Sequence, residues 1–151
     1  MSGWPRGRPE VETLLGEGSL QRVRGAAAAG GDWLDKAGRT LETASGVVDG
    51  DPESAYVLAY DAARQACAGL LAQQGLRATV RGGHIAVERA VRAQFGDGFR
   101  PFGALRRRRN ELEYPSFPGE RVEPGEVRDA IASSRRIIDA ATALLPNLPL
   151  Y

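Results

Sequence analysis

The sequence predicts an all-α protein, a helical bundle of four main helices with short helices beside them. Apolar residues recur at helical rather than strand spacing along several long segments. Proline or an N-cap residue begins most of these segments, and glycine or proline follows their ends. The connections between them are short, which is typical of helices that pack as neighbours in one bundle.

The first thirty residues are the least regular part of the chain. Residues 1–30 are expected to form an N-terminal helical extension, and their role is unassigned. Weak helical patterns cover residues 10–15 and 20–28. Residues 31–151 are expected to form the bundle domain. Its first helix begins at Asp32 and carries one apolar stripe, which comprises Leu34, Ala37, Leu41, Ala44 and Val48.

The second bundle helix is expected to lie at the centre, because it has the broadest apolar face. Asp51 is a good N-cap, Pro52 suits the first helical position, and Gly75 supplies the stop. After a loop, a shorter helix is expected over residues 84–95, and the helix with four arginines follows. Pro124 begins the last long helix, whose inner side includes Val127, Ile131, Ser134, Ile138, Ala141 and Leu145.

Composition restricts the kind of site that the chain can hold. The 20 basic and 19 acidic residues nearly cancel, so a site for a polyanion must be local. With one cysteine, Cys67, and one histidine, internal disulfides and a Cys/His zinc site are excluded. No metal and no cofactor are expected. We find neither an apolar run of about 18 residues nor a leader pattern, so we expect a cytoplasmic protein without a membrane partner.

The four consecutive arginines face different directions on their helix. With about 100° of rotation per residue, Arg109 lies within the apolar stripe and Arg107 lies opposite it. Arg106 and Arg108 flank the stripe. Because a buried guanidinium is costly unless it is paired, Arg109 needs either a carboxylate partner or a functional role.

Two carboxylates are candidate partners for Arg109. Glu113 follows it by four residues, and Asp61 flanks the apolar face of the central helix. On the outer face, Arg107 and Glu111 are expected to form a surface pair that contributes about a few tenths of a kcal/mol. A structural ion pair and a site role fit Arg109 equally well.

The arginine helix resembles the HEPN superfamily, compact helical bundles with an Arg-Asn-x-x-x-His motif near the end of a late helix. The corresponding stretch is Arg109-Asn110-Glu111-Leu112-Glu113-Tyr114, followed by proline. The segment SAYVLAYDAARQACAGLLAQQGLRAT also resembles the central helix of that family, with its Tyr-x-x-Ala-x-x-Ala spacing. The resemblance covers roughly residues 30–145.

The resemblance implies a metal-independent endoribonuclease that acts as a homodimer, with the motif helices of both protomers in a shared cleft. Arg109 would contact the scissile phosphate, Asn110 would orient the motif, and Arg106 and Arg108 would bind substrate at the border of the cleft. Tyr114 stands where the family has histidine. The expected partners are RNA or a nucleotide, and a nucleotidyltransferase or antitoxin encoded nearby.

Tyr114 is a poor replacement for the proton-transferring histidine. Cleavage through the ribose 2′-hydroxyl needs a group that titrates near neutral pH, as histidine does at about 6.5 and tyrosine, at about 10, does not. About one tyrosine in a thousand is ionised at pH 7, a deficit of about 4 kcal/mol for a general base. A hydrogen bond from Tyr114 to phosphate is still compatible with this position.

His84 is the only histidine that could support the site. It shares a helix face with Val87, Val91 and Phe95, so it is expected to point inward, with a pKa lowered by burial and by the positive helix end. Packing at a helix start is the simpler interpretation of this residue. A catalytic role is the alternative.

Three functions are consistent with these residues. The first, which we favour because Arg109 and Asn110 are present without the histidine, is a HEPN module that binds RNA, a nucleotide or a partner, with impaired or absent nuclease activity. The second is an active HEPN ribonuclease of the toxin–antitoxin type. The third is a structural dimerisation unit. The apolar Tyr114 and Phe117 after the motif favour a dimer.

Overall fold

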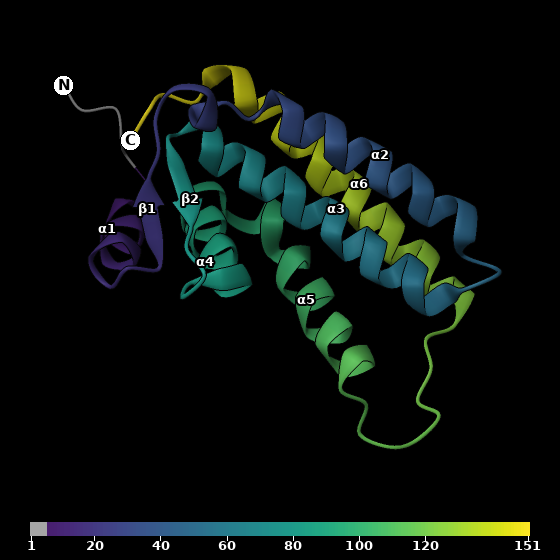
Figure 1. Cartoon of the computed structure of the whole chain (residues 1–151). Coiled ribbons are helices and arrows are strands. Elements are labelled where there is room, and N and C mark those ends of the chain that lie inside the picture. The colour runs from purple at the N-terminus through teal and green to yellow at the C-terminus, as the bar shows by residue number, and fades with distance from the viewer. Residues whose placement is uncertain (1–5) are drawn as a thin grey trace.

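The computed structural model of the chain describes residues 6–151 and consists mainly of helices (Figure 1). Three long helices lie along one another: α2 (Gly31–Val47), α3 (Pro52–Gln73) and α6 (Pro124–Leu144). The predicted all-α class is therefore confirmed. In this part of the chain, every helix is too short or too polar to cross a membrane.

The boundaries of α3 follow from local chemistry. The Asp51 carboxylate accepts a hydrogen bond from the Ser54 backbone N–H at 3.1 Å, and Pro52 is the first helical residue. Gly75 then turns the chain with a φ of 75°, a conformation that glycine adopts readily. Both predicted boundaries of the central helix are confirmed.

The core surrounds α3, which is buried along most of its length. Tyr60, Leu70 and Cys67 are each fully buried on this helix. Burial raises the pKa of the Cys67 thiol, consistent with a cysteine that serves as a small apolar side chain. The ring of Tyr60 stacks on Phe102, with ring centroids 5.6 Å apart, and this contact joins α3 to the arginine helix.

Glycines let α2 and α3 approach at backbone distance. A Cβ atom on Gly30 would lie 2.1 Å from the carbonyl oxygen of Gly69, and one on Gly69 would lie 2.8 Å from the Cβ of Trp33. The Gly30 N–H also donates to the side chain of Gln73 at 2.9 Å. This contact fixes Trp33 beside the C-terminal half of α3.

Two further helices cover α3 on its other side. Helix α4 (Gly83–Phe95) is followed by a 3-10 turn, η2 (Gly96–Phe99), and by α5 (Arg100–Glu113), which carries the arginines (Figure 1). Residues 114–123 then cross to α6 without regular structure. A last 3-10 turn, η3 (Leu145–Asn147), follows α6.

The described N-terminal residues pack onto the bundle. Helix α1 (Arg8–Gly16) contacts α4 and buries Val11 and Leu14 completely. Strand β1 (Leu20–Arg22) pairs antiparallel with β2 (Leu76–Ala78), and a 3-10 turn, η1 (Gly25–Ala28), follows β1.

The helix expected over residues 20–28 is therefore wrong. Gly18 and Gly25 have positive φ angles and interrupt any α-helix there. Residues 20–22 instead pair with residues 76–78, and residues 25–28 form only a 3-10 turn. β2 lies within the stretch that was expected to be a loop after α3. Both strands have only three residues, which is too short for an alternation of apolar and polar side chains to be recognised in the sequence.

Candidate functional site

Side chains from three helices meet around the buried phenol of Tyr60. Arg64 comes from α3, His84 from α4, and Arg106 and Arg109 from α5; we name these four the arginine–histidine cluster. Each of the three arginines acts electrostatically on both Tyr60 and His84, which places all of them close to the same point. The cluster therefore unites residues that are far apart in the sequence.

Tyr60 and His84 are joined by a hydrogen bond of 2.7 Å between the phenol oxygen and Nδ1. Tyr60 is fully buried, and burial raises its pKa, so the phenol keeps its proton. Within the described residues its hydroxyl has no hydrogen bond other than the one to His84, so donation to Nδ1 is the arrangement that leaves no buried O–H unsatisfied. The proton of the neutral imidazole is then on Nε2. In this state His84 presents an N–H donor to its surroundings, not a base.

The inward direction predicted for His84 holds for its Nδ1, which bonds to the buried Tyr60 phenol, while the residue as a whole lies exposed at the start of α4. The predicted lowering of its pKa is confirmed. Burial is the main cause, followed by Arg64 and Arg109, while Asp61 opposes them.

Arg109 lies against the core, as its helical position predicted. It forms an ion pair with Glu113, and its guanidinium carbon is 6.0 Å from the centroid of the Tyr60 ring. It also donates a long hydrogen bond of 3.5 Å to the side chain of Asn110, which is itself exposed. The Nε atom of Arg109 is buried and has no hydrogen-bond partner among the described residues.

Arg64 is a member of the cluster that sequence reasoning missed. It follows Tyr60 by four residues and so lies on the same face of α3, which was the available signal. Asp61, expected as a partner of Arg109, instead lies 3.8 Å from the Nε of Arg64, beyond hydrogen-bond distance. That Nε is also buried and has no hydrogen-bond partner in residues 6–151.

Arg106 is held by Glu88, a second residue that the sequence did not reveal. The Arg106 Nε donates to the Glu88 carboxylate at 2.8 Å, and the Glu88 residue is 8% exposed. The approach depends on Gly103, because a Cβ there would lie 2.2 Å from a Glu88 carboxylate oxygen. Glu88 follows His84 by four residues, so both belong to one side of α4.

Arg108 has a different set of partners and ties α5 to α6. Its Nε donates to Glu126 at 2.7 Å, and it also pairs with Glu111 at 3.2 Å and donates to the Arg121 carbonyl. The surface pair expected between Arg107 and Glu111 is wrong, because side chains three apart also meet on a helix and Glu111 pairs with Arg108.

Tyr114 lies at the end of α5 and projects into solvent. The residue is 77% exposed, and its backbone N–H donates to the Asn110 carbonyl at 2.9 Å to close the helix. The part of the chain that the structure describes shows no bond between Tyr114 and the cluster. Phe117 is also 58% exposed, and the homodimer stays a prediction of the family resemblance.

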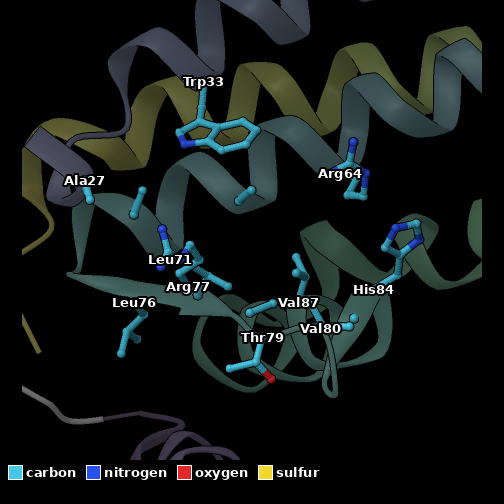
Figure 2. Close-up of a pocket in the computed structure, with 14 residues that line it drawn as sticks. Ala27, Trp33, Arg64, Leu71, Leu76, Arg77, Thr79, Val80, His84 and Val87 are labelled. Atoms are coloured by element: carbon cyan, nitrogen blue, oxygen red, sulfur yellow. The ribbon is translucent and has the colours of Figure 1, made fainter. Parts of the chain in front are cut away.

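A pocket of about 450 Å³ adjoins the cluster. It lies between α3, β2, the start of α4 and Trp33 of α2, and Arg64 and His84 line one end of it (Figure 2). Across residues 6–151, no group of three or more His, Cys, Asp or Glu side chains is arranged to hold a metal ion. The guanidinium group of Arg64 and the imidazole N–H of His84 are hydrogen-bond donors at the edge of an apolar pocket. Such donors suit an anionic ligand.

Comparisons with protein-family models, with curated proteins and with solved structures give no match to this chain. The resemblance to the HEPN superfamily therefore rests on the motif Arg109-Asn110 and on the pattern of the central helix.

Proposed function

We propose that this protein is an RNA-binding module related to the metal-independent HEPN endoribonucleases, and that its own cleavage activity is impaired or absent. The RNA backbone would bind at the arginine–histidine cluster. The toxin–antitoxin or defence setting, and a nucleotidyltransferase or antitoxin partner, belong to this proposal through the same resemblance.

The observation that carries the proposal is the pair of unused donors at the centre of the cluster. The Nε atoms of Arg64 and Arg109 are buried without hydrogen-bond partners among the described residues, while their side chains remain 27% and 25% exposed. An unpaired buried donor costs about 1–3 kcal/mol. Phosphate oxygens that reach the cluster would bond to the exposed parts of both guanidinium groups, and a small shift of the side chains would bring the Nε donors to them.

The same geometry argues against strong cleavage. A general base needs a free lone pair near the 2′-hydroxyl, and the Nδ1 lone pair of His84 is occupied by Tyr60 while Nε2 carries the proton. Tyr114 is exposed and has no bond to the cluster within the described part of the chain. These groups are suited to hold phosphate and unsuited to move a proton at neutral pH.

A purely structural role is the second candidate, and one observation favours it. Each arginine of the cluster is already paired with a carboxylate: Arg64 with Asp61, Arg106 with Glu88, and Arg109 with Glu113. The Arg106–Glu88 pair joins α5 to α4 without any ligand, while the other two pairs lie within α3 and within α5. An arginine has five N–H donors, however, so one carboxylate leaves others available.

Binding of a fluorescent single-stranded RNA at low salt tests the proposal. Arg64→Gln and Arg109→Gln should each weaken binding by about tenfold or more, as expected for a lost charged hydrogen bond. Arg135→Gln, on the exposed side of α6, is the matched control and should bind as the parent does. Binding that all three variants retain, or no binding by the parent, would favour the structural role.

A second experiment concerns the missing histidine. The parent protein should leave the RNA intact. If the parent cleaves RNA without added metal, and Arg109→Gln abolishes this cleavage, the proposal of an RNA-binding module without nuclease activity is contradicted. Tyr114→His restores the motif, and a gain of cleavage would support the relation to the endoribonucleases. If this variant binds RNA but stays inactive, a latent nuclease cleft is ruled out while the binding proposal stands.

A further inference from the structure

The pocket beside the cluster has the size and lining of a site for a small molecule. Its volume of about 450 Å³ lies within the range of about 300–1,000 Å³ that is usual for ligand pockets. Most of the wall is apolar and comes from Trp33, Leu71, Leu76 and Val87. Figure 2 shows Trp33 on the α2 side of this space, with Arg64 and His84 together at one end.

The walls of the pocket are held in place independently of any ligand. Trp33 is fixed by the backbone contact between Gly30 and Gly69. On the opposite side, Thr79 ties the loop after β2 to the N-terminal segment, because its hydroxyl donates to the Gly18 carbonyl at 2.6 Å and its N–H to the Ser19 carbonyl at 3.0 Å. A preformed pocket avoids the entropic cost of ordering its walls when a ligand binds.

The polar groups of the pocket select for negative charge. Arg64, Arg77 and His84 line it, and no carboxylate belongs to its lining within the described residues. The hydrogen bond from Tyr60 to Nδ1 leaves the Nε2–H of His84 as a donor. His84 also stands in the first turn of α4, whose positive end favours an anion.

We infer that this pocket binds a small molecule that combines a flat apolar ring with one anionic group. The ring lies against Trp33 and the aliphatic wall, and the anion lies between Arg64 and His84. Two kinds of compound have this chemistry, a nucleoside monophosphate and an aromatic carboxylate. The pocket shares Arg64 and His84 with the arginine–histidine cluster, so such a ligand would compete with RNA phosphate.

Tryptophan fluorescence reports directly on the pocket. The chain has two tryptophans, so Trp4→Phe leaves Trp33 as the only one. Titrations of this protein would compare AMP with ribose 5-phosphate, which lacks the ring, and phenylacetate with phenylacetamide, which lacks the charge. We expect at least one ring-bearing anion to change Trp33 emission and to bind about tenfold more tightly than its matched control. The gain would come from burial of the apolar ring for AMP and from the arginine bond to the carboxylate for phenylacetate.

Variants of the Trp4→Phe protein separate ligand binding in the pocket from RNA binding at the arginine–histidine cluster. Ala68→Phe places a ring within the pocket lining without removing charge and should abolish the Trp33 response. Arg64→Gln should lower the affinity for the anion by about tenfold, whereas Arg135→Gln should leave it unchanged. Circular dichroism and thermal unfolding establish that each variant is folded.

The outcomes also distinguish this inference from the proposed function. If calorimetry shows that AMP and ribose 5-phosphate bind equally and phenylacetate does not bind, and Trp33 emission is unchanged, the pocket inference is overturned while phosphate binding by the cluster survives. If RNA does not bind but a ring-bearing anion gives the expected response, the proposed function fails and the pocket inference holds. The more tightly bound of AMP and phenylacetate shows which of the two chemistries the pocket prefers.

Discussion

Four neighbouring arginines on α5 occupy four different environments. Arg109 pairs with Glu113 beside the Tyr60 ring, Arg106 pairs with the nearly buried Glu88, and Arg108 is held by Glu126 of α6. Arg107 is exposed. The cause is the rotation of about 100° per residue along a helix, which turns each side chain toward a different neighbour.

The lowered pKa of His84 predicts that the protein loses stability at acid pH. Its folded pKa is lowered, so the folded state resists a proton that the unfolded chain accepts near pH 6.5. The free energy of unfolding should therefore be highest above about pH 6.5 and should fall as the pH drops below that value. Tyr60, Asp61 and Arg64 on α3 and two arginines on α5, Arg106 and Arg109, are the titratable groups that face the imidazole.

Urea unfolding of the parent and of His84→Gln between about pH 7 and pH 5 measures this effect. The parent should lose more stability than the variant over this range, because glutamine cannot take up the proton. Carboxylates contribute equally to both proteins and cancel in the comparison. Parallel pH profiles would show that His84 is not the group responsible.

At the scale of elements, close contacts of glycine decide how the helices meet. Gly69 lets α2 approach α3 and positions Trp33, and Gly103 admits the Glu88 carboxylate between α4 and α5. Arg108 supplies a polar counterpart by joining α5 to α6. Each of these contacts between helices thus depends on one or two small or charged residues.

Gly69→Ala should destabilise the protein by about 1–3 kcal/mol. The added methyl would lie 2.8 Å from the Cβ of Trp33 and 3.0 Å from the Gly30 carbonyl oxygen, so the backbones must separate. Gly46→Ala in α2 is the matched control, since nothing lies within 4 Å of its added methyl. The control should gain about 0.5–1 kcal/mol from helix propensity. Equal urea midpoints for both variants would contradict the close contact.

Arg108→Gln tests whether this arginine is a connector. Stability should fall by about 1 kcal/mol or less, as is usual for partly exposed ion pairs, while RNA affinity should stay within error of the parent. Urea unfolding and RNA titration on the same preparation give both values. A large loss of affinity with unchanged stability would return Arg108 to the substrate-binding group suggested by the family resemblance.

At the scale of the whole molecule, basic and acidic residues nearly balance, with a formal net charge of +1. Such a surface attracts nucleic acid only weakly as a whole. RNA affinity must therefore come from the few arginines that α3 and α5 bring together. This makes the salt dependence of binding small and attributable to named residues.

The slope of log K against log salt should be about −2 for single-stranded RNA, if Arg64, Arg106 and Arg109 each contact one phosphate. Arg109→Gln should reduce its magnitude by about 0.7, and Arg135→Gln should leave it unchanged. Titrations over a series of salt concentrations measure both slopes. A steep slope that Arg109→Gln does not alter would locate the RNA elsewhere on the surface.

The sequence by itself determined the all-α class, the boundaries of α3 and the inward direction of Arg109, and it offered Glu113 as one of two candidate partners. These features depend on residues within a few positions of one another, where helical geometry and capping act directly. Only the tertiary structure decided that residues 20–22 pair with 76–78, that His84 bonds to Tyr60, and that Glu88 and Arg64 join the site. Contacts between distant segments depend on how helices pack, and no spacing along the chain records that.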